Sequence, residues 1–122
     1  MSINEEVFET MLNRHFPERA RELEQEKAKR KEQAAKDDPL TSVCRTALWR
    51  FGVARQKVKA MEECAELIVQ LAKGSDSAAT IVDEIADVTI MMRQLTIVYG
   101  EKAIQERIDF KVDRLRKLLG AA

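Results

Sequence analysis

Four acidic residues stand in two pairs of matching spacing, and together they could do chemistry. Glu63 and Glu66 form the first pair, and Glu84 and Asp87 form the second pair further along the chain. Residues three apart project from the same side of an α-helix, one turn above the other. Two helices that face each other would therefore aim all four carboxylates into one small volume. That geometry suits a hard divalent cation such as Mg²⁺, which takes oxygen ligands from carboxylates, waters and phosphates.

Two further polar side chains, Gln56 and Lys59, lie on the face of the first acidic pair. At about 100° per residue, the four positions fall within roughly 80° of arc. The alternative to a metal site is a solvated polar stripe in which Lys59 bridges to Glu63. The second pair argues against this alternative, because Ile90 and Met91 follow it one turn later on an apolar helix. The carboxylates therefore stand where a helix enters the interior.

The composition favours a small helical protein. The chain has 122 residues, of which 34% are charged and only 5% are aromatic, a balance that disfavours a sandwich or barrel. Lys plus Arg and Asp plus Glu both total 21, so no net charge draws the chain to nucleic acid or to an anionic membrane. The sequence shows no signal-like N-terminal segment and no apolar run of membrane-spanning length, so we expect a cytoplasmic protein.

Several other kinds of site are disfavoured by the histidine and cysteine content. The only histidine, His15, lies outside the predicted core domain, whereas a ferritin-like di-iron centre needs Glu-x-x-His on two helices. Ser-His-Asp and Cys-His catalysis are disfavoured for the same reason, and no glycine-rich phosphate loop is present. Cys44 and Cys64 are interpreted as small buried hydrophobic residues in a reducing compartment.

Residues 1–38 are predicted to form a charged helical extension. Apolar residues recur at helical spacing up to Phe16, and Pro17 suits the first turn of a second helix that reaches Lys36. The basic run at 27–31 is interpreted as part of a solvated helix and not as a nucleic-acid contact, because acidic residues flank it on both sides. The boundary is placed at Pro39, since the residue before a proline is pushed out of the helical region.

Residues 39–122 are predicted to form an all-α domain, a helical bundle of about four core helices. Thr41 or Ser42 is expected to cap the first helix, and Gly52 is expected to end it. The next helices are expected at about 53–73, 77–99 and 101–119, and Trp49 is interpreted as a core residue, not a stacking platform for a nucleobase. The helix at 77–99 is apolar nearly all round, so we expect it to form the interface of a homodimer or homotetramer.

The acidic pairs and their neighbours form one extended motif. It reads G-x-x-x-Q-x-x-K-x-x-x-E-x-x-E-L from Gly52 to Leu67, followed by EIADV from Glu84 to Val88. This arrangement resembles the MazG-like nucleoside triphosphate pyrophosphohydrolases of the all-α NTP pyrophosphatase superfamily. The likeness covers about residues 40–119 and includes F-K-x-x-R-L at the C-terminal end, which is similar to the family's basic last helix. The first 38 residues lie outside it.

The resemblance implies hydrolysis of an NTP or dNTP to the nucleoside monophosphate and pyrophosphate, with a role in nucleotide-pool control. The implied cofactor is Mg²⁺, with Mn²⁺ as a substitute. The implied metal ligands and catalytic residues are Glu63, Glu66, Glu84 and Asp87. The implied substrate-binding residues are Gln56, Lys59, Lys111 and Arg114. For Lys111 and Arg114 the alternative is a pair of surface charges favourable to the dipole at a helix C-terminus.

Two other functions are compatible with the sequence. One is a non-catalytic helical interaction or regulatory module that keeps the superfamily core and docks a partner through its charged N-terminal helix. The other is an activity like that of phosphoribosyl-ATP pyrophosphohydrolase. The resemblance counts against the second, because that enzyme's motif continues to Tyr-His after the aspartate, where this chain has Ile90 and Met91.

Overall fold

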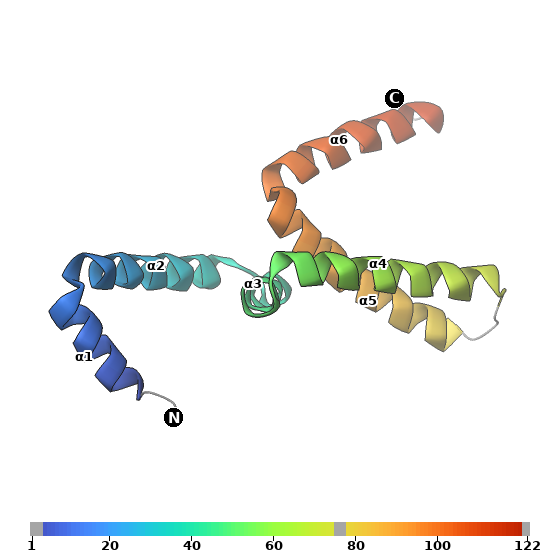
Figure 1. Cartoon of the computed structure of the whole chain (residues 1–122). Helices are drawn as coiled ribbons and strands as arrows, with labels where there is room; N and C mark the ends of the chain where they lie inside the picture. Colours follow the sequence, from blue (N-terminus) through green and yellow to red (C-terminus); the bar gives the residue numbers. More distant parts are fainter. Residues whose placement is uncertain (1–3, 75–77, 121–122) are drawn as a thin grey trace. The chain divides into compact units, whose positions relative to one another are not determined.

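All regular structure that the computed structural model describes, in residues 4–74 and 78–120, is α-helical (Figure 1). The helices are α1 (Glu5–His15), α2 (Pro17–Lys36), α3 (Pro39–Phe51), α4 (Val53–Ala72), α5 (Ala78–Tyr99) and α6 (Glu101–Leu118). The predicted all-α class is confirmed. Among the helices of the described residues, none has the length and apolar character needed to cross a membrane.

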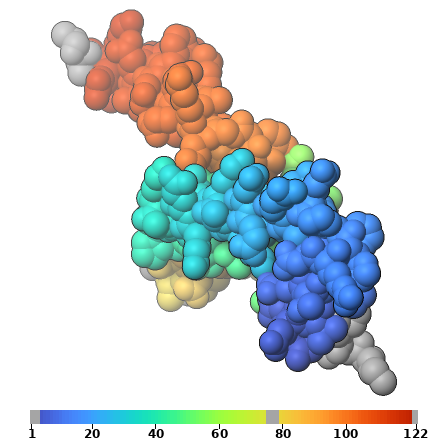
Figure 2. Space-filling view, turned by 90° about the vertical axis from the view of Figure 1, so that its left-hand side faces the viewer, coloured from blue at the N-terminus to red at the C-terminus, as the bar shows by residue number. Residues whose placement is uncertain are grey.

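The chain divides after Asp38 into two compact units. The first unit contains α1 and α2, which pack against each other in the blue part of Figure 2. Ala20 is buried in this contact, and the Lys27 ammonium lies 3.2 Å from the Glu9 carboxylate across it. Pro17 begins α2, as predicted. The rest of α2 is almost entirely exposed, which fits a solvated helix.

Single glycines turn the chain between consecutive helices of the second unit. Gly52 alone separates α3 from α4, and Gly100 alone separates α5 from α6. Their φ angles are 89° and 110°, in a region that residues with a Cβ atom rarely adopt. Each glycine also donates its N–H to the helix before it and accepts from the helix after it. Both helix breaks were predicted from the sequence, and both are confirmed.

Helices α3, α4 and α5 form the packed part of the second unit. Cys44 on α3 is 1% exposed, and its thiol donates to the Ile90 carbonyl oxygen on α5 at 3.7 Å. Ala60 on α4 and Met91 on α5 are the other buried apolar side chains described in this unit. A small residue such as Ala60 lets two helices approach closely. Cys44 is therefore a buried residue, as predicted, while Cys64 is only half-buried.

Two predictions about α3 are wrong. The helix begins at Pro39, so Thr41 and Ser42 lie inside its first turn and do not cap it. Proline is favoured at a first helical position because its missing N–H needs no partner there. Trp49 is 69% exposed and does not join the core, since the buried side of α3 passes through Thr41 and Cys44 instead. The predicted start of the helix at 77–99 lies outside the described residues.

The last helix does not complete a four-helix bundle within the chain. In Figure 1, α6 (orange to red) leads away from α4 and α5 after its start. It contacts α5, and the Glu101 carboxylate in its first turn lies 2.9 Å from the Arg45 guanidinium on α3. Ile104 is half-buried, but the other large apolar side chains of α6 are exposed. Much of α5 is exposed as well, including Val82 and Ile85.

Helices α4 and α5 are joined by a buried pair of amides. The Gln56 side chain donates through Nε2 to Gln94 Oε1 at 2.8 Å, and both residues are less than a tenth exposed. Gln94 Nε2 also lies 3.9 Å from the Met91 sulfur. A buried amide without a partner costs free energy, so this hydrogen bond favours one rotation and one register of the two helices.

The amide pair can be tested by a double-mutant cycle. We expect Gln56→Leu or Gln94→Leu alone to lower the free energy of unfolding by about 1–3 kcal/mol, because each leaves a buried amide unpaired. The double variant should cost less than the sum of the two. Urea unfolding followed by circular dichroism measures all three. The control is Gln105→Leu on α6, an exposed glutamine bonded to Asp109, for which we expect less than about 0.5 kcal/mol. Additive costs at positions 56 and 94 would contradict the coupling.

Candidate metal centre

The facing sides of α4 and α5 carry the candidate site. On α4 the buried residues Gln56, Ala60 and Glu63 recur at intervals of four and three, so they share one side of the helix. On α5, Glu84 and Asp87 precede the buried Met91 and Gln94 at the same intervals. The two helices run antiparallel, since Gln56 near the start of α4 meets Gln94 near the end of α5. Glu63 therefore stands opposite the first half of α5.

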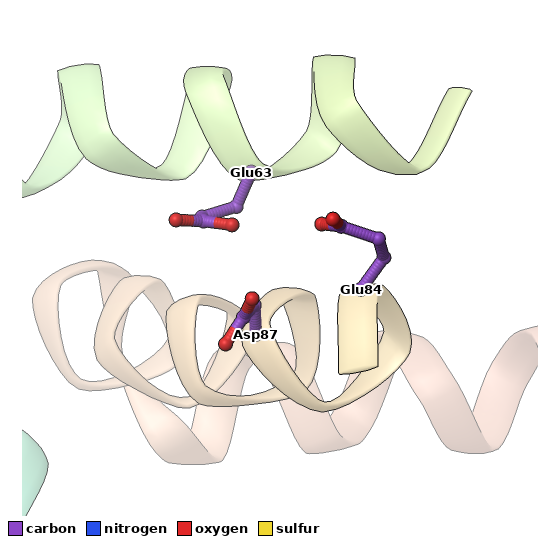
Figure 3. Close-up of side chains that lie close together, drawn as sticks. All are labelled: Glu63, Glu84 and Asp87. Carbon is purple, nitrogen blue, oxygen red and sulfur yellow. The ribbon is translucent and has the colours of Figure 1, made fainter. Parts of the chain in front are cut away.

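Three of the four predicted carboxylates come together between these helices. Glu63 from α4 and Glu84 and Asp87 from α5 each place one carboxylate oxygen within 4.8 Å of the other two (Figure 3). Glu63 is buried, Glu84 is half-buried and Asp87 is exposed. Glu63 Oε2 and Glu84 Oε2 are shielded from solvent and have no hydrogen-bond partner. The prediction that acidic pairs on two helices converge is therefore confirmed for three residues.

One cation faces this group. The Lys59 ammonium lies 2.9 Å from Glu63 Oε1 and 3.9 Å from the Glu62 carboxylate. The hydrogen bond and the charge of Glu63 raise the pKa of Lys59 above its usual range, so the side chain stays protonated. This contact uses one oxygen of Glu63 and leaves the other free. Lys59 thus neutralises one negative charge, and among the residues that the structure describes no ion pair joins a cation to Glu84 or Asp87.

The neighbouring negative charges also affect the protonation of Glu84. Loss of hydration raises the pKa of this carboxyl above its ordinary value of 4.5, and the charges of Glu66, Asp87 and Glu63 raise it further. A hydrogen bond with Glu66 acts in the same direction. The neighbourhood therefore favours a proton on Glu84 unless another cation is supplied.

The fourth predicted ligand, Glu66, lies at the edge of the group. Its side chain is exposed and is not among the three that converge, although it interacts with Glu84. Glu66 lies three residues after Glu63 on α4, which rotates it by about 60° from the line that faces α5. Spacing alone predicts a shared face, and the rotation of α4 against α5 decides which member of the pair points inward.

Of the four predicted substrate-binding residues, one adjoins the acidic group, one is buried between the helices and two are exposed on α6. Lys59 adjoins the acidic group, and Gln56 is buried with its amide bonded to Gln94. Lys111 and Arg114 are exposed on α6, the helix that leads away from α4 and α5 in Figure 1. Gln94 was missed by sequence reasoning. The sequence did contain a sign of its position, because Gln94 continues the spacing of three and four residues that begins at Glu84 and Asp87.

The three carboxylates fit a divalent cation bound by oxygen. On an octahedral Mg²⁺, oxygens about 2.1 Å from the ion lie about 3.0 Å apart when cis and about 4.2 Å apart when trans, and at least two of any three pairs are cis. Oxygens already within 4.8 Å of one another therefore need to close by at most about 1.8 Å. The shielded, unpaired oxygens of Glu63 and Glu84 are the kind of groups that a metal satisfies. Carboxylate-only donors favour Mg²⁺, Mn²⁺ or Ca²⁺ over softer metals.

Comparisons of the chain with protein-family models, curated proteins and solved structures gave no match.

The raised pKa of Glu84 predicts a pH dependence of stability. Between 4.5 and its higher folded value, the folded state binds more protons than the unfolded state at this site. The free energy of unfolding therefore falls as the pH rises through that window. We expect Glu84→Gln to remove this contribution, so the metal-free variant should melt at a higher temperature than the wild type at pH 7. The difference should shrink as the pH falls to 4.5.

Thermal unfolding in EDTA from pH 4 to pH 8 measures this effect. Asp83→Asn is the matched control, since Asp83 is the exposed neighbour of Glu84 and lies outside the converging group. Its profile is expected to follow that of the wild type. A Glu84→Gln variant less stable than the wild type at every pH would show that the carboxylate stabilises the fold.

Proposed function

We propose that the acidic group binds Mg²⁺, or Mn²⁺ in its place, and that the protein hydrolyses an NTP or dNTP to the nucleoside monophosphate and pyrophosphate. The observation that carries the proposal is the convergence of Glu63, Glu84 and Asp87 with two shielded, unpaired oxygens. The motif from Gly52 to Leu67 and EIADV supports the same assignment through its resemblance to MazG-like pyrophosphohydrolases. The proposed setting is nucleotide-pool control in the cytoplasm.

The chain's own residues have distinct parts in this reaction. Bound Mg²⁺ supplies neutralisation of the phosphate oxygens and polarisation of the phosphorus that water attacks. Glu63, Glu84 and Asp87 hold it, and Glu66 stands beside Glu84 as a fourth carboxylate. Lys59, already paired with Glu63, orients that carboxylate and adds positive charge near the phosphates.

The other assigned substrate contacts depend on movement or assembly. Gln56 reaches a substrate only by giving up its bond to Gln94, so its part in the site is to fix α4 against α5. Lys111 and Arg114 on α6 are proposed to contact the pyrophosphate end of the substrate. We also propose that the protein works as a homo-oligomer and that its helical bundle is completed by another copy.

Removal of a metal ligand tests the proposal. With a panel of NTPs and dNTPs, we expect Mg²⁺-dependent release of pyrophosphate, not orthophosphate, that EDTA abolishes. Glu63→Gln and Asp87→Asn should each lower kcat/KM by about a hundredfold or more, because a lost ligand removes several kcal/mol of charge stabilisation. A coupled pyrophosphate assay measures the rates, and circular dichroism checks that the helices remain.

Asp83→Asn is the control for these variants, since Asp83 is an exposed neighbour of Glu84 that does not join the converging group. Its activity is expected to stay within a few-fold of the wild type. Normal hydrolysis by Glu63→Gln and Asp87→Asn would refute the metal assignment. Calorimetry in which the wild type binds neither Mg²⁺ nor a non-hydrolysable nucleotide would favour the non-catalytic helical module.

A further inference from the structure

The two oxygens of the Glu63 carboxylate are in different environments. Oε1 accepts a hydrogen bond from the Lys59 ammonium at 2.9 Å, whereas Oε2 is shielded from solvent and has no partner. The residue as a whole is only 7% exposed, and its carboxylate lies between α4 and α5 (Figure 3). Glu63 therefore presents one free oxygen to the acidic group and not two.

The contact between Lys59 and Glu63 is made within α4. The two residues are four positions apart, so consecutive turns of one helix hold them together without help from α5. Lys59 also lies 3.9 Å from the Glu62 carboxylate, a longer contact to an exposed side chain. An ion pair is stronger where one partner is shielded from water, so the buried Glu63 is the main partner of Lys59. The orientation of the Glu63 carboxylate is thus fixed before a cation binds.

Divalent cations of different size make different demands on a carboxylate. Ca²⁺ takes about six to eight oxygens at about 2.3–2.6 Å and accepts both oxygens of one carboxylate. Mg²⁺ takes ligands at about 2.1 Å in a near-ideal octahedron, in which neighbouring ligands subtend about 90° at the ion. The two oxygens of a single carboxylate are too close together to subtend that angle, so Mg²⁺ takes one of them. A glutamate limited to one oxygen therefore favours Mg²⁺ over Ca²⁺.

We infer that Lys59 sets the metal preference of the acidic group by occupying one oxygen of Glu63. A cation that binds both oxygens must come close to the Lys59 ammonium or displace it from Oε1. Because the positive charges repel each other, this second contact is weakened for Ca²⁺. Binding of Mg²⁺ through Oε2 alone leaves the Lys59 contact intact. Lys59 is thus a positioning residue that acts through Glu63, and this role rests on the proposed metal site.

The restriction applies to Glu63 and not to the other two carboxylates of the group. In the part of the chain that the structure describes, no ammonium or guanidinium forms an ion pair with Glu84 or Asp87. A Ca²⁺ ion can still use these side chains, so Lys59 changes the relative affinity for the two cations and does not abolish Ca²⁺ binding. The quantity that reports its role is the ratio of the two dissociation constants.

Displacement of Mn²⁺ from the full chain, followed by electron paramagnetic resonance of the free ion, tests the inference. Titration of the Mn²⁺-loaded protein with Mg²⁺ and with Ca²⁺ gives a dissociation constant for each. Lys59→Met keeps a long side chain and removes the donor, so we expect the ratio of the constants to shift towards Ca²⁺ by about fivefold or more. Loss of a positive charge alone strengthens the binding of both cations, so the ratio separates the two effects.

Two other variants serve as controls. Lys57→Met removes a positive charge from the same helix, at a side chain that lies 4.9 Å from the centre of the Tyr99 ring, and its ratio should match that of the wild type. Lys59→Arg keeps a cation in reach of Glu63 Oε1 and should retain the wild-type ratio. Circular dichroism checks that the helices remain in all three variants.

A wild-type ratio in Lys59→Met would overturn the inference, as would an equal shift in Lys57→Met or in Lys59→Arg. These readouts do not depend on hydrolysis. If the wild type binds Mn²⁺ and Lys59→Met shows the expected shift but no nucleotide releases pyrophosphate, the proposed reaction alone is wrong. If the wild type binds no Mn²⁺, the proposed metal site and this inference both fail.

Discussion

Mutual repulsion among carboxylates held between α4 and α5 is the constraint on which the rest of the structure depends. Glu63, Glu84 and Asp87 converge, and Lys59 offsets only part of their charge. Like charges so close are stable in a folded chain only when something fixes the helices that carry them. The buried bond between Gln56 and Gln94 does so two turns away, and the packing of α3 through Cys44 supports it. These contacts therefore hold the three carboxylates together although their charges repel one another.

The second unit has an unusual distribution of polarity. The contact between α4 and α5 contains Gln56, Glu63 and Gln94, while large apolar side chains on both helices stay exposed. Most domains bury apolar side chains and expose charged ones. The polar contact fixes the register of the two helices and holds the three converging carboxylates between them.

Some helix ends and residue environments were predicted correctly from the sequence, and others were not. Helix ends at Pro17, Gly52 and Gly100 were predicted correctly, because a fixed proline ring and a missing Cβ atom act within the chain segment itself. The start of α3 and the exposure of Trp49 were predicted wrongly. Several residues near Thr41 can begin a helix, and a tryptophan's burial depends on what packs over it. The spacing of the acidic pairs predicted the convergence of three carboxylates, and it grouped with them Glu66, whose side chain is exposed.

The sequence alone determined the helices, their glycine turns and the spacing that puts carboxylates on a common face, since each of these is set by neighbours within a few residues. The tertiary structure decided how α4 and α5 are rotated against each other. That rotation turns Glu63 inward and Glu66 outward and pairs Gln56 with Gln94. It arises from side-chain contacts between residues nearly 40 positions apart, which periodicity within one helix does not encode.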